Sequence, residues 1–455
     1  MNIKKRLLSI ILILMAIGAQ GQTPKGWWLG MLEEHGLPLN MQITEQDGHP
    51  AVLMYSPAQQ TDPMPSGSYS FSGDTLRYES KPLGLKMKLI YRQNDSSWSC
   101  SFTQGFLASK LTLYPTDTLY QLKRPQTPKA PFPYDEIAAR VERKKAGVVL
   151  TGTLTMPYDI DPGFSRGKKT KYPAVVLVSG SGQQNRDEEL MGHKPFLVLA
   201  DYLTRQGIAV LRYDDRGTGG STGDVANATT LDFADDAEAM MEWLRQQPGI
   251  DPDRVGIVGH SEGGLIAPIV ASRNRHTGFI VMLAGPGYSG GEILLQQNEA
   301  LWQAQGADTA LISLRLRFLS ALFAGDSNAD QLLTPYSKEQ LKEAGLNKGG
   351  VMMLRQQLEN PWMKTFISLN PKPYLRKTRC PILAINGEKD LQVPSLKNLL
   401  SIQYWAPQAE VHPMPGLNHL MQHCKTGLPN EYMLIEETMS PEVMELVAKF
   451  VLKTK

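Results

Sequence analysis

The spacing of hydrophobic positions changes near residue 125. From Gly26 to about Leu122, apolar and polar residues alternate in short runs that end at Gly, Pro, Asn or Asp, as in "LPLNMQIT" and "LKMKLIY". Such alternation is typical of β-strands with one buried face. The runs recur often enough for about seven or eight strands. They predict a small antiparallel β domain, either a sandwich or a barrel, over residues 22–125.

A segment with four prolines, residues 123–135, follows this region and is the expected linker. Beyond it, runs that are apolar throughout alternate with segments of helical period. The clearest runs are 174–180, 208–215, 255–261, 279–285, 381–387 and 409–415. Strands that are apolar on both faces and separated by helices predict a parallel sheet covered on both sides. We therefore expect an α/β domain over residues 126–455, with "VVLTGTLTMP" as a hairpin strand near its start.

Residues 288–374 interrupt this alternation. Stretches such as "ALISLRLRFLSALFAG" and "VMMLRQQLENPW" have helical periodicity and are rich in Leu, Met, Phe and Trp. The segment is predicted to be a helical cap inserted into the sheet domain. Its apolar residues either line a substrate pocket or form the core of the cap itself.

The first 21 residues have the features of a secretory signal peptide. Lys4, Lys5 and Arg6 precede an apolar run from Leu7 to Ile17, and small residues follow before Gln22. This run is too short to span about 30 Å of hydrocarbon, so we expect a secreted or periplasmic protein without a stable membrane span. Removing the leader takes the formal net charge from +2 to −1, which argues against a nucleic-acid partner.

The three cysteines are an odd number for a chain expected to meet an oxidising compartment. Cys380 should open a buried strand and Cys424 should lie beyond its far end, which is too far for a disulfide. We expect three free and mostly buried thiols.

Two segments match the pattern Gly-x-Ser-x-Gly, residues 259–263 and 287–291. The pattern alone is a weak signal, so its context decides. Ser261 directly follows an apolar run, where a tight strand-to-helix turn between two glycines would expose its hydroxyl. Ser289 is separated from its run by Gly-Pro-Gly. We predict that Ser261 is a nucleophile, the alternative being an ordinary helix N-cap.

A serine nucleophile needs a histidine base and an acid that orients it. Four of the eight histidines follow Ser261 in the sequence, at positions 276, 412, 419 and 423. His419 is the predicted base because it lies on the loop after the last predicted strand. Glu388 and Asp390 both follow the preceding strand, and Asp390 is favoured because it lies deeper in the loop. A zinc site built from His419, His423 and Cys424 lacks a clear fourth ligand, so no metal or other cofactor is expected.

The stretch "SGSGQQNRDEE", residues 179–189, follows the first parallel strand. Its glycines let a backbone N–H of Ser181 or Gln183 join that of Glu262 in an oxyanion hole. The "RDEE" end of the stretch either binds the amino terminus of a peptide or makes local salt bridges. Arg216, in a second glycine-rich loop, is predicted to be an internal salt-bridge partner.

Five stretches in order carry a resemblance to a known family: "GSGQQNRDE", "KPFLVLADYLTRQGIAVLRYDDRGTGGS", "GHSEGG", "INGEKDLQVP" and "GLNHLMQ". Together they resemble bacterial α/β-hydrolases of the dienelactone-hydrolase and serine-aminopeptidase type, close to secreted carboxylesterases of Bacteroidota. The resemblance runs from about residue 152 to the C-terminus. It implies an α/β-hydrolase fold, a Ser261, Asp390 and His419 triad and an oxyanion loop at Ser181. "SGSG" departs from the "HGSG" of many members.

These features favour a serine esterase that acts on small-molecule esters with short or medium acyl groups. The same triad also cleaves amides, so a serine peptidase acting on small peptides is the main alternative. A third hypothesis is a binding protein whose β domain holds glycan or peptide on an inactive hydrolase scaffold. The acyl and alcohol groups, the oligomeric state and the ligand of the β domain do not follow from the sequence.

Overall fold

The computed structural model describes residues 24–32, 37–57, 63–64, 67–104, 107–158 and 171–454. The chain divides into two compact units, residues 1–123 and 124–455. The expected signal peptide, residues 1–21, lies outside the described residues. Within the described ranges, no helix is both long and apolar enough to cross a membrane.

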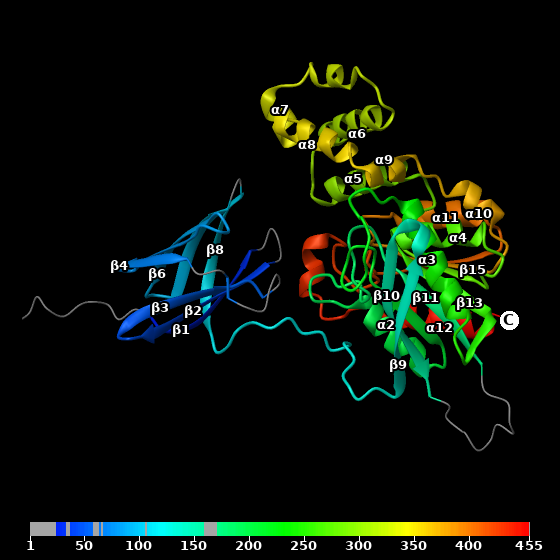
Figure 1. Ribbon diagram of the computed structural model, residues 1–455. Coiled ribbons are helices and arrows are strands. Elements are labelled where there is room, and N and C mark those ends of the chain that lie inside the picture. Colours follow the sequence, from blue (N-terminus) through cyan, green and yellow to red (C-terminus); the bar gives the residue numbers. More distant parts are fainter. Residues whose placement is uncertain are drawn as a thin grey trace, which may run out of the picture. The chain divides into compact units, whose positions relative to one another are not determined.

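The first unit contains one antiparallel sheet in the order β3-β2-β1-β8-β7-β6-β5-β4. Its strands are β1 (Gly26–Leu32), β2 (Leu37–Gln46), β3 (His49–Tyr55), β4 (Ser68–Ser72), β5 (Thr75–Ser80), β6 (Leu85–Arg92), β7 (Ser97–Gln104) and β8 (Leu107–Thr116). Because successive side chains alternate between faces, one face collects the apolar residues. Figure 1 shows the sheet folded over on itself, and side chains such as Met41, Leu89 and Trp98 fill the space inside.

The second unit is built on an eight-stranded sheet in the order β16-β15-β14-β13-β11-β12-β10-β9. Its strands are β9 (Tyr134–Arg143), β10 (Val148–Pro157), β11 (Tyr172–Val178), β12 (Ala209–Tyr213), β13 (Ile250–His260), β14 (Ile280–Leu283), β15 (Ile382–Gly387) and β16 (Ala409–Met414). The strands from β11 to β16 pair in parallel, as the apolar runs predict. β10 is the predicted hairpin strand, antiparallel to both β9 and β12.

Helices cover both faces of this sheet (Figure 1). The helices α2 (Pro195–Arg205) and α12 (Pro441–Lys453) pack on one face through a core that includes Leu199 and Val447. The other face is covered by α3 (Thr230–Arg245), α4 (Glu262–Ala271), α10 (Lys372–Lys377) and α11 (Ser395–Trp405). Strands buried on both sides must be apolar at every position, which explains the continuous apolar runs.

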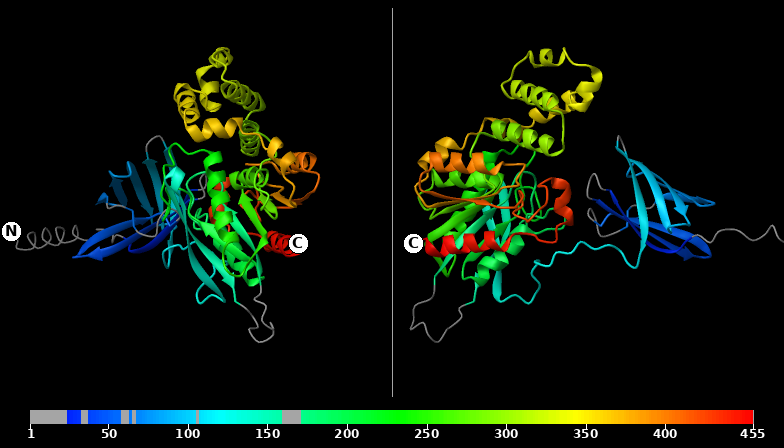
Figure 2. Two further views of the ribbon diagram at one scale, coloured as in Figure 1. Left: turned by 45° about the vertical axis from the view of Figure 1, so that its right-hand side comes forward. Right: turned by 180° about the vertical axis from the view of Figure 1, so that it is seen from behind.

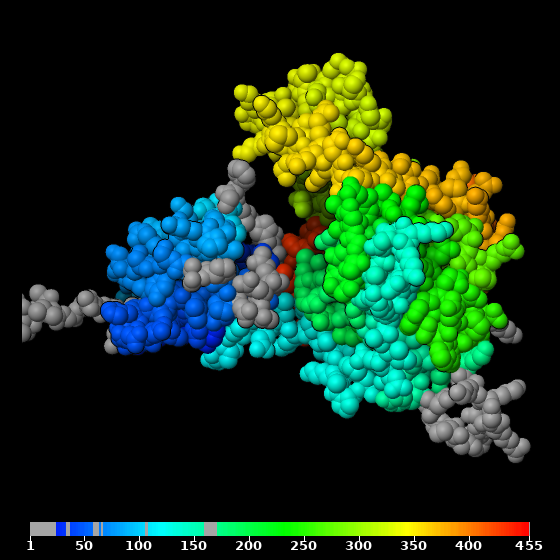
Figure 3. All heavy atoms as spheres, viewed as in Figure 1, coloured from blue at the N-terminus to red at the C-terminus, as the bar shows by residue number. Residues whose placement is uncertain are grey.

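The segment between β14 and β15 is helical. It contains α5 (Gly290–Ala304), α6 (Thr309–Phe323), η2 (Ala329–Leu333), α7 (Lys338–Glu343), α8 (Lys348–Leu358) and α9 (Pro361–Ser368). Figures 2 and 3 show α6, α7 and α8 as a lobe that projects from the second unit. Leu314 and Phe318 of α6 pack with Leu346 in a core of their own. The apolar face of α6 therefore serves the lobe itself.

Two short 3₁₀ helices complete the second unit, η1 (Lys144–Ala146) and η3 (Pro429–Leu434). The proline-rich segment expected as a linker is attached to this unit at its first residues. The guanidinium of Arg124 donates to the carbonyl oxygens of Met433 and Met191 at 2.7 and 2.8 Å. Gln126 donates to the carbonyl oxygen of Met439 at 2.7 Å. Because residues 124 and 126 are bonded to the second unit, the free part of the predicted linker ends close to Lys123.

All three cysteines are free, as the sequence predicts. Cys100 is fully buried and Cys380 and Cys424 are partly buried, in agreement with the expectation of mostly buried thiols. Burial raises the pKa of the Cys100 and Cys380 thiols to about 12, which keeps both protonated and unreactive.

Candidate active site

Ser261 lies in a sharp turn between the end of β13 and the start of α4. Its φ angle is 53°, a value that costs free energy for a residue other than glycine. A Cβ atom added at Gly263 would collide with the carbonyl oxygen of Val178, so the turn requires glycine there. Such a strained turn at the carboxyl end of a parallel strand holds a serine hydroxyl at the sheet edge, with the first N–H groups of the next helix beside it.

His419 and Asp390 form a buried pair. Nδ1 of His419 lies 2.8 Å from Oδ2 of Asp390, and the two side chains are 5% and 0% exposed. The other carboxylate oxygen accepts the N–H groups of Gln392 and Val393 at 2.8 and 2.9 Å. The alternative acid, Glu388, is exposed. Because Nδ1 faces the carboxylate, Nε2 is the ring nitrogen that remains for a substrate or a nucleophile.

The pair lies beside the serine turn. His260 directly precedes Ser261, its ring centroid is 5.0 Å from that of His419, and its Nε2 is 3.0 Å from the backbone oxygen of His419. Asp390 follows β15 and His419 follows β16, so all three predicted triad residues stand at the carboxyl edge of the sheet. This is the edge at which open parallel sheets bind ligands.

The other candidate nucleophile has a structural role. The hydroxyl of Ser289 caps α5, donating to Glu292 Oε2 at 2.5 Å and accepting the Glu292 N–H at 3.4 Å. The "GYSGG" match is thus a capping box at the start of a helix.

The other three histidines that follow Ser261 either bond to a different carboxylate or lie within a strand. His276 and His423 are exposed and bond to Glu242 and Glu437, and His412 lies within β16. Since His423 faces Glu437 while His419 faces Asp390, the two do not converge on one point. In the described part of the chain, no three His, Cys, Asp or Glu side chains are grouped to hold a metal.

The loop after β11 supplies the candidate oxyanion donors. A Cβ atom added at Gly180 would lie 3.2 Å from Cβ of Ser261, so this loop closely approaches the turn. Ser181 and Gln183 are exposed, and among the described residues no hydrogen-bond acceptor is found for their N–H groups. The Gln184 N–H, in contrast, already donates to Asp215 at 3.0 Å. The predicted donors, with the first N–H of α4 at Glu262, are therefore free to bind an oxygen atom.

Glu188 and His260 form an interaction that the sequence analysis missed. Glu188 Oε1 accepts the Gly180 N–H at 2.7 Å and faces His260 Nδ1 at 2.9 Å. Burial alone would lower the pKa of His260, but the Glu188 carboxylate and the backbone oxygen of His419 raise it to about 9. The imidazolium of His260 thus connects three segments. They are the loop after β11 (the oxyanion loop), the turn at Ser261 and the loop that carries His419.

The four residues of "RDEE" all have ion-pair partners. The pairs are Arg186 with Asp214, Asp187 with Arg212, Glu188 with His260 and Glu189 with Lys194. The salt-bridge interpretation of this stretch is therefore correct for each residue. Arg216 is likewise an internal partner, at 2.7 Å from Asp236.

The side chain of Glu262 points away from the serine and is buried. Its Oε1 accepts the hydroxyl of Thr230 on α3 at 2.6 Å and the indole N–H of Trp362 on α9 at 2.7 Å. Burial raises the pKa of Glu262, and these two hydrogen bonds oppose that change only in part. The residue after Ser261 is thereby bonded to the helical segment that precedes β15.

Asp215 is a third carboxyl group near the site, and it is bonded to the loop after β11. Asp215 accepts the hydroxyl of Ser179 at 3.0 Å. Burial, with added repulsion from Glu188 and Glu262, raises its pKa to about 8, although the hydrogen bonds from Gln184 and Ser179 favour the charged form. Asp215 is consequently mostly protonated at neutral pH.

Comparison with known proteins identifies the family of the chain. The family model of the X-Pro dipeptidyl-peptidase (S15 family) matches residues 37–409, which is more than half of the chain. The chain belongs to the S15 family. The match includes Ser261 and Asp390 and ends before His419. This family match places the chain in the α/β-hydrolase superfamily.

Individual relatives are more distant. Esterase EstD of Thermotoga maritima is 26% identical over 310 residues, which are 67% of this chain and 66% of the relative. The uncharacterized peptidase YuxL of Bacillus subtilis is 29% identical over 135 residues, 28% of this chain and 19% of the relative. The chain thus spans less than two thirds of the length of either relative.

Among solved structures, an esterase of Pyrococcus furiosus aligns with 74% of this chain and 99% of its own. It is 16% identical, with a TM-score of 0.43.

Proposed function

We propose that this S15-family hydrolase cleaves short- or medium-chain carboxylic esters through an acyl-enzyme at Ser261. The Ser261 hydroxyl adds to the ester carbonyl while His419 Nε2 takes its proton, and Asp390 stabilises the resulting imidazolium. The Glu262 N–H and that of Ser181 or Gln183 bind the oxyanion. His419 then returns the proton to the leaving alcohol. A water molecule, activated by the same histidine, hydrolyses the acyl-enzyme and releases the acid.

The observation that carries the proposed chemistry is the buried Asp390–His419 pair beside a serine with positive φ. A histidine whose Nδ1 is held by a carboxylate in this way is oriented to act as a base through its other nitrogen. An ordinary helix N-cap at Ser261 would need neither the strained turn nor this pair.

The preference for esters rests on the carboxylates around the turn. A peptidase that trims from an amino terminus needs a free carboxylate to bind the terminal ammonium. Glu188, Glu262 and Asp215 each accept hydrogen bonds from protein groups instead. We further propose that the helical segment 288–374 caps the site, because Trp362 on α9 bonds to the residue after Ser261.

A peptidase is the second candidate, favoured by the matching family model, which is that of an X-Pro dipeptidyl-peptidase. Asp215 is the carboxyl group best suited to an ammonium in this case, because it is partly exposed and has no cationic partner among the described residues. Its raised pKa keeps it mostly neutral without a ligand, and an ammonium bound beside it would favour the charged form. The two candidates share one triad and differ in what binds beside it.

A substrate panel distinguishes them. We expect p-nitrophenyl acetate or butyrate to be hydrolysed with a kcat/KM at least about a hundredfold above any aminoacyl or X-Pro dipeptidyl p-nitroanilide, which corresponds to about 2.7 kcal/mol. The Ser261→Ala variant controls for background hydrolysis. An anilide that matches the esters would overturn the ester preference, and Asp215→Asn would then be expected to abolish the anilide activity selectively.

Export of the chain is also part of the proposal. The leader pattern of residues 1–21 and the nearly balanced charge without it support a secreted or periplasmic hydrolase, as in the carboxylesterases of Bacteroidota that the motifs resemble. Mass spectrometry of the protein from a periplasmic extract should give a chain that begins at Gln22. An unprocessed chain found only in the cytosol would contradict export.

A further inference from the structure

The first unit has a hollow of about 670 Å³ on the outer face of β4 to β8. This face is opposite the apolar core and is not part of the proposed hydrolase site. Four cations line it, Arg77, Lys86, Lys88 and Lys110, and all four are exposed. The only acidic residue in the lining is Glu79, which pairs with Lys86 at 3.7 Å.

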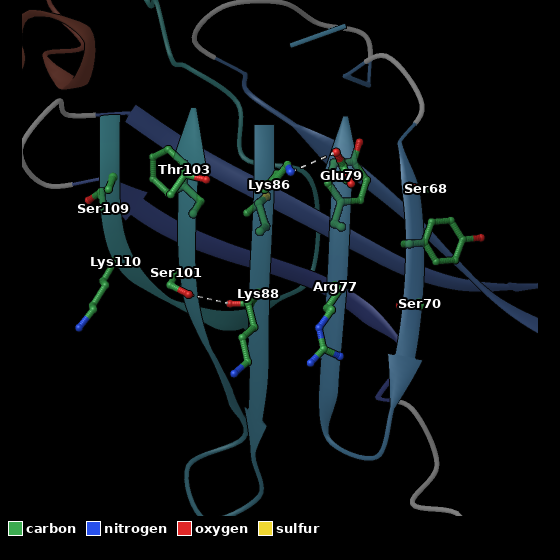
Figure 4. Close-up of a pocket in the computed structure, with 15 residues that line it drawn as sticks. Ser68, Ser70, Arg77, Glu79, Lys86, Lys88, Ser101, Thr103, Ser109 and Lys110 are labelled. Atoms are coloured by element: carbon green, nitrogen blue, oxygen red, sulfur yellow. Dashed lines mark hydrogen bonds and ion pairs between the residues drawn. The ribbon is translucent and has the colours of Figure 1, made fainter. Parts of the chain in front are cut away.

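Three of the cations stand in one row across the sheet. Arg77 on β5 lies directly opposite Lys88 on β6, and Ser101 on β7 lies opposite both Lys88 and Lys110 on β8. Figure 4 shows the three side chains with their nitrogen atoms directed towards the same end of the strands. With strands about 4.8 Å apart, the positive charges follow one another at roughly 5 and 10 Å.

This row does not stabilise the fold by itself. In the part of the chain that the structure describes, no carboxylate lies within ion-pair distance of Arg77, Lys88 or Lys110. Like charges directly opposite each other on neighbouring strands, such as Arg77 and Lys88, destabilise a sheet. A ligand with several negative charges would remove this repulsion and gain from all three cations.

Hydroxyl groups on the same face indicate the chemical class of the ligand. Ser70 continues the row on β4, opposite Arg77, and Ser101 lies between the two lysines. Serine hydroxyls both donate and accept hydrogen bonds, as sugar hydroxyls do. Tyr69 on edge strand β4 lies opposite the core residue Tyr78, so its ring belongs to the other face of the sheet and the row itself offers cations and hydroxyl groups.

We propose that this face binds an acidic polysaccharide, a polymer of sugars that carry carboxylate or sulfate groups. Single-stranded nucleic acid would need a series of aromatic rings for its bases, but Tyr69 is the only exposed ring among the described lining residues, since Tyr78 and Phe102 are buried. Insertion into a membrane would need exposed aliphatic side chains, and the lining presents lysine, arginine and hydroxyl groups instead.

Binding of defined polymers to the full chain tests the proposal. Polygalacturonate and dextran sulfate are compared with neutral dextran, a thymidine oligonucleotide and phosphatidylglycerol vesicles in low salt. The variant Arg77→Thr/Lys88→Thr/Lys110→Thr removes the row, and Lys25→Thr/Lys81→Thr/Arg92→Thr removes the same charge from the same unit outside the hollow. We expect one or both acidic polysaccharides to bind, at least tenfold more weakly to the row variant than to the control variant, with affinity falling as salt is added.

Each other outcome overturns the proposal. Equal loss in both triple variants would mean that net charge, and not this row, determines binding. Dextran that binds as tightly as the acidic polymers would exclude a charge-based site. An oligonucleotide or vesicle that binds tighter than both polysaccharides would show a different ligand class. Thermal unfolding of the row variant checks its fold, and its melting temperature should equal or exceed that of the wild type because a like-charge pair is lost.

Discussion

The two Gly-x-Ser-x-Gly segments of this chain have the same five-residue pattern but different structures. At residues 259–263 the serine has a positive φ and lies beside a buried histidine–carboxylate pair. At residues 287–291 the serine has an ordinary extended backbone and forms a capping box with Glu292. On the proposed assignment, the motif contains a nucleophilic serine only where the strand ends directly at the serine and other strands bring a base to the same edge.

The largest expected difference is between the two serine substitutions. Ser261→Ala should lower kcat on p-nitrophenyl butyrate by at least about 10⁴-fold, because the attacking oxygen is lost. Ser289→Ala should leave kcat unchanged and cost about 1 kcal/mol of unfolding free energy, the usual effect of losing an N-cap. Steady-state kinetics, urea unfolding and labelling by a fluorophosphonate probe measure these effects. Labelling that persists in Ser261→Ala and disappears in Ser289→Ala would reverse the assignment.

A second pair of substitutions tests the base beside the first segment. His419→Ala should reduce kcat at least about a thousandfold with the fold intact, since Ser261 then has no proton acceptor. His423→Ala is the matched control, because that histidine is exposed and bonds to Glu437. Comparable losses in both variants, or a loss confined to His423→Ala, would contradict the role of His419.

The glycines give a comparison in stability. A Cβ atom at Gly263 would collide with the backbone oxygen of Val178, which cannot move without disturbing β11. Gly263→Ala should therefore cost about 3 kcal/mol of unfolding free energy or prevent folding. At the equivalent Gly291 the nearest atom is a methyl group of Ile367 at 3.3 Å, so Gly291→Ala should change stability by no more than about 1 kcal/mol. Equal destabilisation would mean that the two turns are equally tight.

The smallest expected effect concerns Glu188, which has no counterpart near Ser289. Glu188→Gln should lower kcat about ten- to a hundredfold, because the oxyanion loop and the His419 loop lose their common anchor. Glu189→Gln is the control, since Glu189 is exposed and its carboxylate contacts Lys194 and Asn185 rather than His260. Activity of Glu188→Gln equal to that of the control would show that His260 alone holds these loops.

The same pair of variants has a pH signature. Folding raises the pKa of His260 from its ordinary 6.5 to about 9, in the presence of Glu188, Asp390 and the His419 backbone oxygen. The folded state then binds this proton more tightly than the unfolded state, so the stabilisation is complete below about pH 6.5 and is lost as the pH rises through about 9. Urea unfolding from pH 6.5 to 9.5 should show a steeper loss of stability for wild type and Glu189→Gln than for Glu188→Gln. Parallel curves for all three proteins would exclude a charged His260.

Side-chain polarity predicts the class of most strands and the position of the strained serine, although β9 was not predicted. Residues 26–122 alternate with period two because their strands are buried on one face. The runs after residue 172 are continuously apolar because their strands are buried on both faces, so side-chain polarity predicts both classes. The context of Ser261, directly after a run, distinguished it from Ser289 for the same reason. The three free thiols also followed, because strand length limits how close Cys380 and Cys424 can come.

Which groups contact one another depends on the tertiary structure. Position in the loop after β15 favours Asp390 over Glu388, but the contact with His419 depends on the folded loop, which buries Asp390 and exposes Glu388. The anchor between Glu188 and His260 joins residues 72 positions apart, and Trp362 reaches Glu262 from 100 positions away. Patterns of polarity report whether a side chain is buried, but a contact also depends on where the folded backbone carries each partner, and that is a property of the whole packed sheet and its helices.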